Sequence, residues 1–256
     1  MDIRNPRRRF LAGTFGVAGT LLLAGCERLS QTEWFPKVLS AGEKASSAVA
    51  HAVTSRRSMA QEFTEADRSP TFRSNGTAEP DDDDYRALAA NAFADYRLEV
   101  DGLVAQPGSF SLAELRALPS RTQITRHDCV EGWSAIGKWK GARLAALLEA
   151  VRPKPEARFV VFHCADPMEE DGTGFYYESI DFEDAFHPQT ILAYELNDAA
   201  LPIANGAPIR LRVERQLGYK HAKYVMRIEL VESFASIEGG KGGYWEDQGY
   251  QWFAGI

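Results

Sequence analysis

The sequence predicts an α+β fold, with mixed sheets and short helices in a single domain. From residue 96 onward, short segments with alternating polar and apolar residues, typical of strands, are separated by turns that contain Gly or Pro. Short helical segments interrupt these strands irregularly, without the repeating βαβ order of a doubly wound sheet. A hydrophobic share of 45% in 256 residues is sufficient for a buried core and excludes a chain that is disordered throughout.

The first 25 residues have the pattern of an export signal. Three arginines at residues 7–9 precede an apolar run over residues 10–25, which is shorter than the roughly 18 to 20 residues of a spanning helix. The arginines and the following Phe-Leu pair resemble a twin-arginine signal, and Leu-Ala-Gly-Cys at residues 23–26 resembles a bacterial lipobox. We therefore expect a lipid on Cys26. The alternative is a plain secretory signal that ends by chance at a cysteine.

This signal implies a location and suggests a cofactor. The mature protein is expected on the periplasmic side as a membrane-anchored lipoprotein. Twin-arginine export carries folded proteins, and the usual reason to fold first is the insertion of a complex cofactor. Residues 1–25 contribute +3 to the net charge of −7, so the remaining residues carry −10. Such an acidic body argues against nucleic-acid binding.

Residues 26–84 are predicted to be a tether between the signal and a catalytic domain over residues 85–256. Apolar residues at three- and four-residue steps over residues 41–63 predict an amphipathic helix that packs on the body. Residues 64–84 are rich in turn formers and end in four aspartates, which indicates an irregular arm.

The elements of the body follow from local patterns. Residues 97–100 alternate as a strand, and Ser111 with Glu114 forms a capping box that opens a helix ending before Pro119. Residues 143–151 have the spacing of a short amphipathic helix. Further strands are predicted over residues 121–129, 158–162, 175–180, 209–213 and 225–231.

Several chemistries are excluded because their motifs are missing from the sequence. It contains no Walker-type phosphate loop, no Rossmann glycine fingerprint, no Cys-x-x-Cys and no His-Glu-x-x-His. Its five histidines are scattered without the close spacing of a zinc site.

Cys129 is the first of two features that a plain globular domain would not need. It ends a predicted strand just before Gly132 and Trp133, a place where strands deliver functional groups. Its thiolate would serve as a nucleophile or as a ligand of a soft metal. The residues alone leave two alternatives open, namely an inert buried cysteine and a disulfide with Cys164.

The second feature is a basic segment, residues 210–227, in an acidic protein. It holds six Arg and Lys residues and His221 against one acid, Glu214. Gly218 interrupts the segment and would let backbone N–H groups face a ligand. This pattern is typical of an anion site, most readily a phosphate. A solvated basic strand is the alternative.

Three motifs together resemble one known family. Cys-Val-Glu-Gly-Trp-Ser at 129–134, Asn-Gly-Ala-Pro-Ile-Arg-Leu at 205–211 and Gly-Tyr-Lys-His-Ala-Lys-Tyr-Val at 218–225 are similar to motifs of the sulfite oxidase family of molybdopterin enzymes. The resemblance is strongest to the exported bacterial branch that includes the catalytic subunit of periplasmic protein-methionine-sulfoxide reductase. It implies a sulfite-oxidase-type molybdopterin-binding fold with one molybdenum–molybdopterin cofactor per chain.

The resemblance also implies a role for each matching residue. Cys129 becomes the metal ligand and the catalytic residue. The residues that position the pterin and grip its phosphate become Asn205, Arg210, His221, Ala222 and Lys223.

Three further cofactor contacts are expected from the same resemblance. Asn75 belongs to the arm that folds over the cofactor, and His163 falls near a pterin-contacting position. His127 shares a strand face with Cys129, because the two residues are two positions apart.

The activity that the resemblance implies is two-electron oxygen-atom transfer to or from a small oxo-substrate, such as a sulfoxide, sulfite or an N-oxide. Electrons would be exchanged with a haem protein, either a membrane or a periplasmic cytochrome. Acidic residues at 81–84 and 246–247 are candidate docking charges for it. The chain has no room for the additional domains of animal and plant sulfite oxidases, so we expect a monomeric catalytic domain. The substrate itself stays open.

Two other functions stay open at this point. Cys129 with His127 or His163 would suit a thiol hydrolase or peroxidase. A lipid-anchored module that binds a phosphorylated ligand would explain the basic segment without any chemistry. Neither alternative uses both features of the sequence.

Overall fold

The computed structural model describes residues 32, 34, 35, 37, 38, 41, 42 and 58–256. The predicted signal, the lipid-bearing Cys26 and most of the predicted helix over residues 41–63 lie outside these residues. The chain divides into two units, Met1–Ser55 and Arg56–Ile256, and the fold below is that of the second unit. In the described segments, no helix is both long and apolar enough to cross a membrane.

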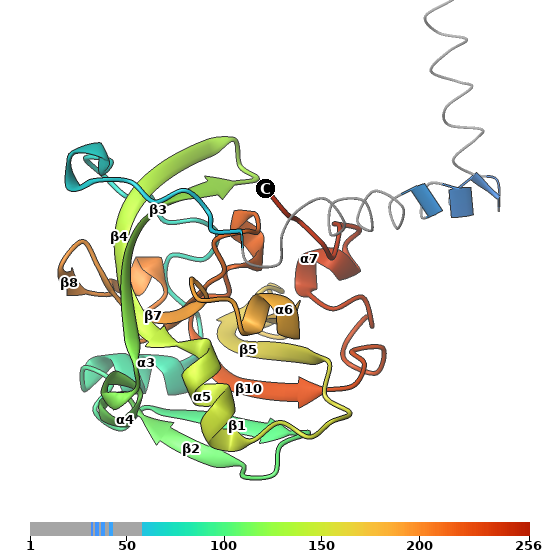
Figure 1. Cartoon of the computed structure of the whole chain (residues 1–256). Coiled ribbons are helices and arrows are strands. Elements are labelled where there is room, and N and C mark those ends of the chain that lie inside the picture. Colours follow the sequence, from blue (N-terminus) through green and yellow to red (C-terminus); the bar gives the residue numbers. More distant parts are fainter. Residues whose placement is uncertain (1–31, 33, 36, 39–40, 43–57) are drawn as a thin grey trace, which may run out of the picture. The chain divides into compact units, whose positions relative to one another are not determined.

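Two sheets of five strands form the framework of this unit (Figure 1). In the first sheet, β1 and β10 are parallel and the other neighbours are antiparallel. Its strands in spatial order are β2 (Gly108–Ser111), β1 (Arg97–Gly102), β10 (Val225–Val231), β5 (Phe159–Pro167) and β6 (Phe175–Asp181).

The second sheet is built around a long antiparallel hairpin, whose two strands pair from Ser120 opposite Ala142 to Cys129 opposite Trp133. All of its strand pairs are antiparallel. Its strands are β3 (Ser120–Cys129), β4 (Trp133–Arg143), β7 (Ile191–Leu196) and β8 (Ala199–Ala200), with β9 (Arg210–Arg212) also paired to β7.

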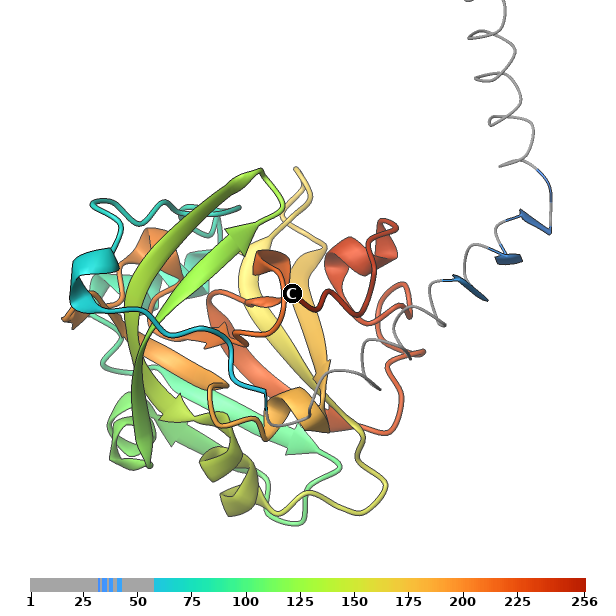
Figure 2. The same cartoon turned by 45° about the horizontal axis from the view of Figure 1, so that its top comes forward.

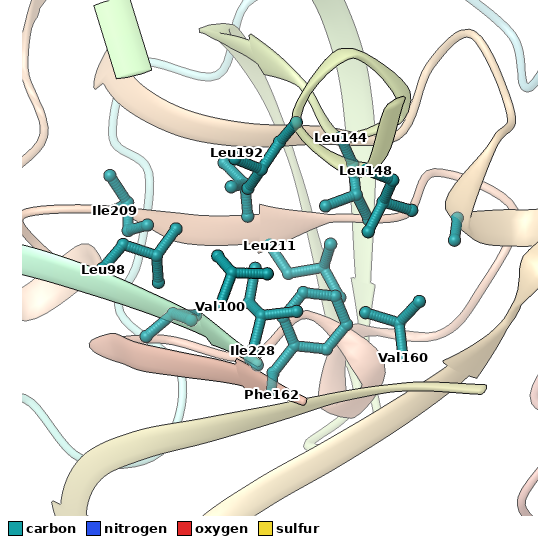
Figure 3. Close-up of a cluster of buried hydrophobic side chains, with 14 of the residues drawn as sticks. Leu98, Val100, Leu144, Leu148, Val160, Phe162, Leu192, Ile209, Leu211 and Ile228 are labelled. Carbon is teal, nitrogen blue, oxygen red and sulfur yellow. The ribbon is translucent and has the colours of Figure 1, made fainter. Parts of the chain in front are cut away.

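The largest apolar core lies where the two sheets and α5 face one another (Figure 3). Alternate residues of β1, β5 and β10 point into it from the first sheet, and residues of β7 and β9 point into it from the second. The labelled side chains are Leu98, Val100, Leu144, Leu148, Val160, Phe162, Leu192, Ile209, Leu211 and Ile228. Because both sheets share this core, the strand ends that carry functional residues are held in fixed relative positions.

Short helices connect the strands, and local sequence explains where they begin. Ser111 and Glu114 form the expected capping box at the start of α4. The side chain of Asp82 caps α3, so the exposed aspartate run, predicted as part of an irregular arm, begins a helix. The helices are α3 (Asp83–Ala90), α4 (Leu112–Ala117), α5 (Leu144–Val151), α6 (Phe182–Ala185) and α7 (Tyr244–Asp247), with 3₁₀ turns at Glu65–Asp67, Ile203–Asn205 and Gly218–Lys220.

The α+β class and the strands and helices expected from residue 97 onward are confirmed, whereas β2, β4, β7 and β8 were not predicted. In β4 the buried positions hold Ala135, Gly137, Trp139 and Gly141, so the apolar alternation of a strand is hidden. A Cβ at Gly137 would lie 2.8 Å from the ring of Phe72, and one at Gly141 only 2.2 Å from the carbonyl oxygen of Leu192. Close packing therefore requires glycine at these two positions, and the same glycines hide the strand pattern in the sequence.

The end of the helix predicted over residues 41–63, just before the arm, takes a different course from the one predicted. Residues 58–63 are extended rather than helical, because the backbone pairs with β3: the N–H of Phe63 donates to Ile124 O at 2.8 Å. Further along, Ser69 N–H donates to Ile136 O at 3.0 Å. Figure 2 shows this segment, in pale blue, following the hairpin of β3 and β4. The arm therefore reaches the strand end that carries Cys129.

Candidate active site

A pocket of about 410 Å³ opens at the end of the β3–β4 hairpin. Residues from the arm, the hairpin turn, β5, β6, the segment before β10 and the C-terminal segment contribute to it. The lining residues are Asn75, Gly76, Thr77, Cys129, Val130, Glu131, Asp166, Met168, Tyr176, Tyr219, His221, Lys223, Trp245 and Tyr250.

Cys129 lies at the last position of β3, where a tight turn begins. Gly132 adopts a φ of +85° and donates its N–H to the Cys129 carbonyl at 3.0 Å, which closes the turn. The side chain is partly buried, and both Cys129 and Cys164 are free thiols, so the disulfide alternative is excluded. Burial raises the pKa of the Cys129 thiol. Metal binding would displace its proton, since a thiolate is the ligand.

Lys223 and Glu131 hold the arm against this turn. The Lys223 ammonium donates to the carbonyl oxygens of Asn75 and Ala204, each at 2.8 Å, and to that of Thr77. The Glu131 carboxylate accepts a hydrogen bond from the backbone N–H of Gly76, also in the arm, at 3.3 Å. Burial lowers the pKa of Lys223 to about 7. The arm is thereby fixed as one wall of the pocket.

Two buried histidines lie side by side behind Cys129. The rings of His127 and His221 are 5.1 Å apart in an edge-to-face arrangement, and His221 lines the pocket. Burial and the neighbouring cation Arg212 hold the pKa of both imidazoles well below their usual value, so both are neutral. Gly218 is required beside them, because a Cβ there would lie 2.6 Å from His127 Nε2.

The tautomers of the two histidines follow from their partners. His221 Nε2 lies 3.0 Å from the carbonyl of Gln216, which only accepts, so Nε2 carries the proton and Nδ1 is an acceptor. His127 Nδ1 lies 2.9 Å from the Arg212 guanidinium, which only donates, so the proton of His127 is on Nε2. Among the described side chains, His221 Nδ1 and His127 Nε2 are buried atoms without a hydrogen-bond partner.

The basic segment is not a solvated strand, because its cations are paired. Arg210 is fully buried and donates to the backbone carbonyls of Asn205 and His221 at 3.0 and 3.1 Å. Arg212 forms a buried ion pair with Glu214 at 2.6 Å. Most of these charges therefore hold the backbone of the motif in place, and Lys223 is the cation of the segment that lines the pocket.

The structure brings some of the predicted residues to the pocket and leaves others behind its wall. Asn75, Cys129, His221 and Lys223 line it. Those that support the wall from behind are His127, Asn205, Arg210 and Ala222.

His163 is not brought to the pocket. Strand alternation places it on the opposite face of β5 from the core residues Phe162 and Cys164. Its Nε2 lies 3.0 Å from Glu229 and 3.2 Å from Arg227. The pocket lining therefore does not include His163, and its pterin contact stays a prediction that rests on the resemblance. The ring of His163 is engaged by Glu229 and Arg227, and the ring of His127 is engaged by Arg212. Neither histidine is therefore free to act as a base for Cys129.

Sequence reasoning missed the aromatic wall and one acid of the pocket. Tyr176, Tyr219, Trp245 and Tyr250 come from three separate segments and carry no common motif. Asp166 is 5% exposed in the pocket, and its Oδ1 has no hydrogen-bond partner. A lone aspartate at a strand end gives no signal in a single sequence.

Comparison with known proteins identifies the class. Residues 86–236, more than half of the chain, match the family model described as the oxidoreductase molybdopterin binding domain. The chain belongs to this family and is a molybdopterin-dependent oxidoreductase, so the resemblance to the sulfite oxidase family is confirmed. The binding domain implies a molybdenum–molybdopterin cofactor.

Individual relatives narrow this assignment. The chain is 39% identical, over 97% of its length and 87% of the relative's, to a protein of Azospira oryzae provisionally described as protein-methionine-sulfoxide reductase subunit YedZ1. It is 35% identical over 158 residues to the protein-methionine-sulfoxide reductase catalytic subunits MsrP of Xanthomonas axonopodis pv. citri and Xanthomonas campestris pv. campestris. That match covers 59% of this chain and about half (49%) of each Xanthomonas protein.

The chain also has a similarity to a solved structure. The sulfane dehydrogenase SoxCD of Paracoccus pantotrophus shares 25% identity with the chain at a TM-score of 0.49. The similarity covers 55% of this chain and 39% of that protein.

The pocket residues fit the cofactor that the family implies. Cys129 supplies a free thiol, the ligand type that soft metals select. Asn75, Asp166 and His221 line this pocket, and each has a buried polar atom without a hydrogen-bond partner. Such atoms are rare in folded proteins unless a ligand satisfies them, and a pterin ring carries several polar groups.

Proposed function

We propose that this chain is the catalytic subunit of an exported protein-methionine-sulfoxide reductase. The relatives named above support the substrate, and the shared family supports the cofactor. In the proposed reaction, a sulfoxide, two electrons and two protons give a thioether and water. Bound molybdopterin supplies the two-electron oxygen-atom transfer chemistry.

The protein's part in this reaction is to hold and orient. Cys129 would bind the metal, and Lys223 with Glu131 would keep the arm closed over the cofactor. Asn205, Arg210 and Ala222 would shape the wall behind it, with His127 and His221 as neutral polar contacts.

The observation that carries the proposed substrate is the aromatic wall. Tyr219, Trp245 and Tyr250 line the pocket together with Met168 and Val130. Val130 and Tyr250 are 46% and 42% exposed, so the pocket's apolar lining extends to the surface. A methionine side chain in a polypeptide would bury its apolar atoms against such a lining.

The charge of the pocket favours the same substrate. Among the described residues, the carboxylates of Glu131 and Asp166 line it, and the one lining cation, Lys223, already donates to the arm. A neutral sulfoxide enters such a pocket without repulsion, whereas the sulfite anion is disfavoured.

Export and electron supply complete the proposal. The signal over residues 1–25 and the lipobox at Cys26 support a lipid-anchored protein on the periplasmic side. The word "subunit" in the relatives' names supports a partner protein, which we propose is a membrane haem protein that delivers electrons. Glu246 is withdrawn as a docking charge, because it is 1% exposed and paired with Lys220.

The decisive experiment compares substrates with the molybdenum-loaded enzyme. With a reduced viologen dye as donor, the enzyme should reduce a peptide that contains methionine sulfoxide. The Tyr250→Ala variant should raise KM for this peptide more than for dimethyl sulfoxide, because Tyr250 lies at the rim. Phe175→Ala, which removes an equally exposed aromatic outside the pocket, is the control. Oxidation of sulfite with no reduction of sulfoxides would refute the proposal.

A further inference from the structure

Within the described part of the chain, three hydrogen-bond acceptors on side chains that line the pocket have no donor. They are Asn75 Oδ1 in the arm, Asp166 Oδ1 on β5 and His221 Nδ1 before β10. The first two are amide and carboxylate oxygens. His221 Nδ1 is an acceptor because its Nε2 donates to the Gln216 carbonyl. Three segments of the chain thus present the same kind of unsatisfied atom to one pocket.

Asp166 is the most costly of the three to leave without a donor. Its side chain is 5% exposed, and burial raises its pKa to about 6. The backbone N–H of Asp166 itself, Lys223 and the side chain of Thr77 oppose this rise of the pKa, yet Oδ1 has no hydrogen-bond partner. A buried carboxylate oxygen without a donor destabilises a fold, so a ligand that supplies one would remove the penalty.

The neighbouring cations do not supply this donor. Lys223 directs its ammonium to the carbonyls of Asn75, Thr77 and Ala204. Arg210 directs its guanidinium to the backbone behind the pocket wall. The part of the ligand that lies beside Asp166 must therefore bring N–H or O–H groups. A phosphate offers acceptors only, whereas a reduced pterin presents an amino group, an amide N–H and ring N–H groups along its edges.

We propose that Asp166, with Asn75 and His221, forms an acceptor edge that recognises the N–H groups of the pterin ring. The phosphate of the cofactor then lies away from these three atoms. This assignment rests on the molybdopterin cofactor of the family and is independent of the sulfoxide chemistry. Asp166 thereby joins the binding residues, although no sequence motif marks it.

Cofactor retention in the full chain tests this proposal. Wild type, Asp166→Asn, Asp166→Leu and Asn75→Leu are expressed in a molybdenum-replete host, and molybdenum and oxidised pterin are measured per chain during prolonged dialysis. Asp166→Leu should release pterin at least about tenfold faster than wild type, the effect of losing one hydrogen bond to a charged group. Asn75→Leu should release it faster too, and Asp166→Asn should be intermediate because one oxygen remains.

A matched control and a second readout separate binding from folding. Asp171→Leu removes an aspartate that accepts the hydroxyl of Thr173 but does not line the pocket, so its pterin release should stay close to wild type. The cofactor-free Asp166→Asn protein should melt no lower than cofactor-free wild type. Unchanged pterin release in both Asp166→Leu and Asn75→Leu would overturn the proposal, as would a lower melting temperature of cofactor-free Asp166→Asn. Wild type that contains no pterin would refute the cofactor assignment as well.

Discussion

Replacing Lys220 with Met should destabilise the domain strongly, because Lys220 is the counter-ion of two buried carboxyls. Its side chain is 1% exposed, and its ammonium lies 2.5 Å from Glu178 and 2.6 Å from Glu246. Burial and the neighbouring Glu246 raise the pKa of Glu178 well above its usual value, although Lys220 opposes this rise. One proton and one ammonium therefore balance the two acids, and the variant removes the ammonium.

The expected loss is about 3–5 kcal/mol at pH 7.5, the cost of leaving a buried charge without its partner. Without Lys220 a buried carboxylate has no counter-ion and only a proton can neutralise it, so the variant is destabilised at neutral pH and the penalty fades as the pH falls towards about 4. Replacing all three residues, in Lys220→Met/Glu178→Leu/Glu246→Leu, should restore most of the lost stability, because no charge is left buried.

Urea unfolding at pH 7.5 and pH 4.5 measures both effects. Lys140→Met is the control, since its ion pair with Glu195 is partly exposed and should contribute less than about 1 kcal/mol. The ion pair of Lys220 with Glu246 also attaches α7, which carries Trp245, beside the pocket residues Tyr219 and His221. A Lys220→Met protein within 1 kcal/mol of wild type at pH 7.5, or a triple variant no better than the single one, would refute this reasoning.

Three further predictions concern the core, the pocket acid and the arm. Gly141→Ala should lower the free energy of unfolding by about 3 kcal/mol, because the new Cβ would lie 2.2 Å from a backbone oxygen of β7; a fully stable variant would contradict this packing. In cofactor-free protein, the pKa of Asp166 rises from 3.8 to about 6 on folding. Wild type should therefore lose about 3 kcal/mol of stability relative to Asp166→Asn as the pH rises from 4 to 7. Equal denaturation curves of the two proteins at both pH values would exclude this pKa shift. Lys223→Met should accelerate proteolysis within residues 74–77, whereas Lys154→Met at an exposed position should not; equal cleavage rates would show that Lys223 does not hold the arm.

Much of the fold could be predicted because its signals are local. The capping box of Ser111 and Glu114 and the alternation of Arg97–Gly102 each depend on a few neighbouring residues. The long β4 strand escaped prediction because two of its buried positions hold Gly137 and Gly141 where a sequence pattern would require apolar side chains. A neighbouring side chain or backbone leaves no space for a larger residue at either position. Such a requirement exists only once the partner strand is in place.

The candidate site divides in the same way. Cys129, His221 and Lys223 lie in motifs that the sequence shows, and the structure places all three on one pocket. Asp166 and Trp245 reach this pocket only through the pairing of β5 with β10 and the attachment of α7, which join distant segments. His163 illustrates the converse, since its strand was predicted but the partners of its ring, Glu229 and Arg227, carry no signal in the sequence.

The central claim is that Cys129 binds the molybdenum of the cofactor in this pocket. X-ray absorption at the molybdenum edge, on wild type and on Cys129→Ser, tests it most directly. The metal should stay bound in the variant through the sulfur atoms of the pterin, with one sulfur ligand fewer than in wild type and with oxygen transfer abolished. An identical sulfur shell in the two proteins would contradict the claim.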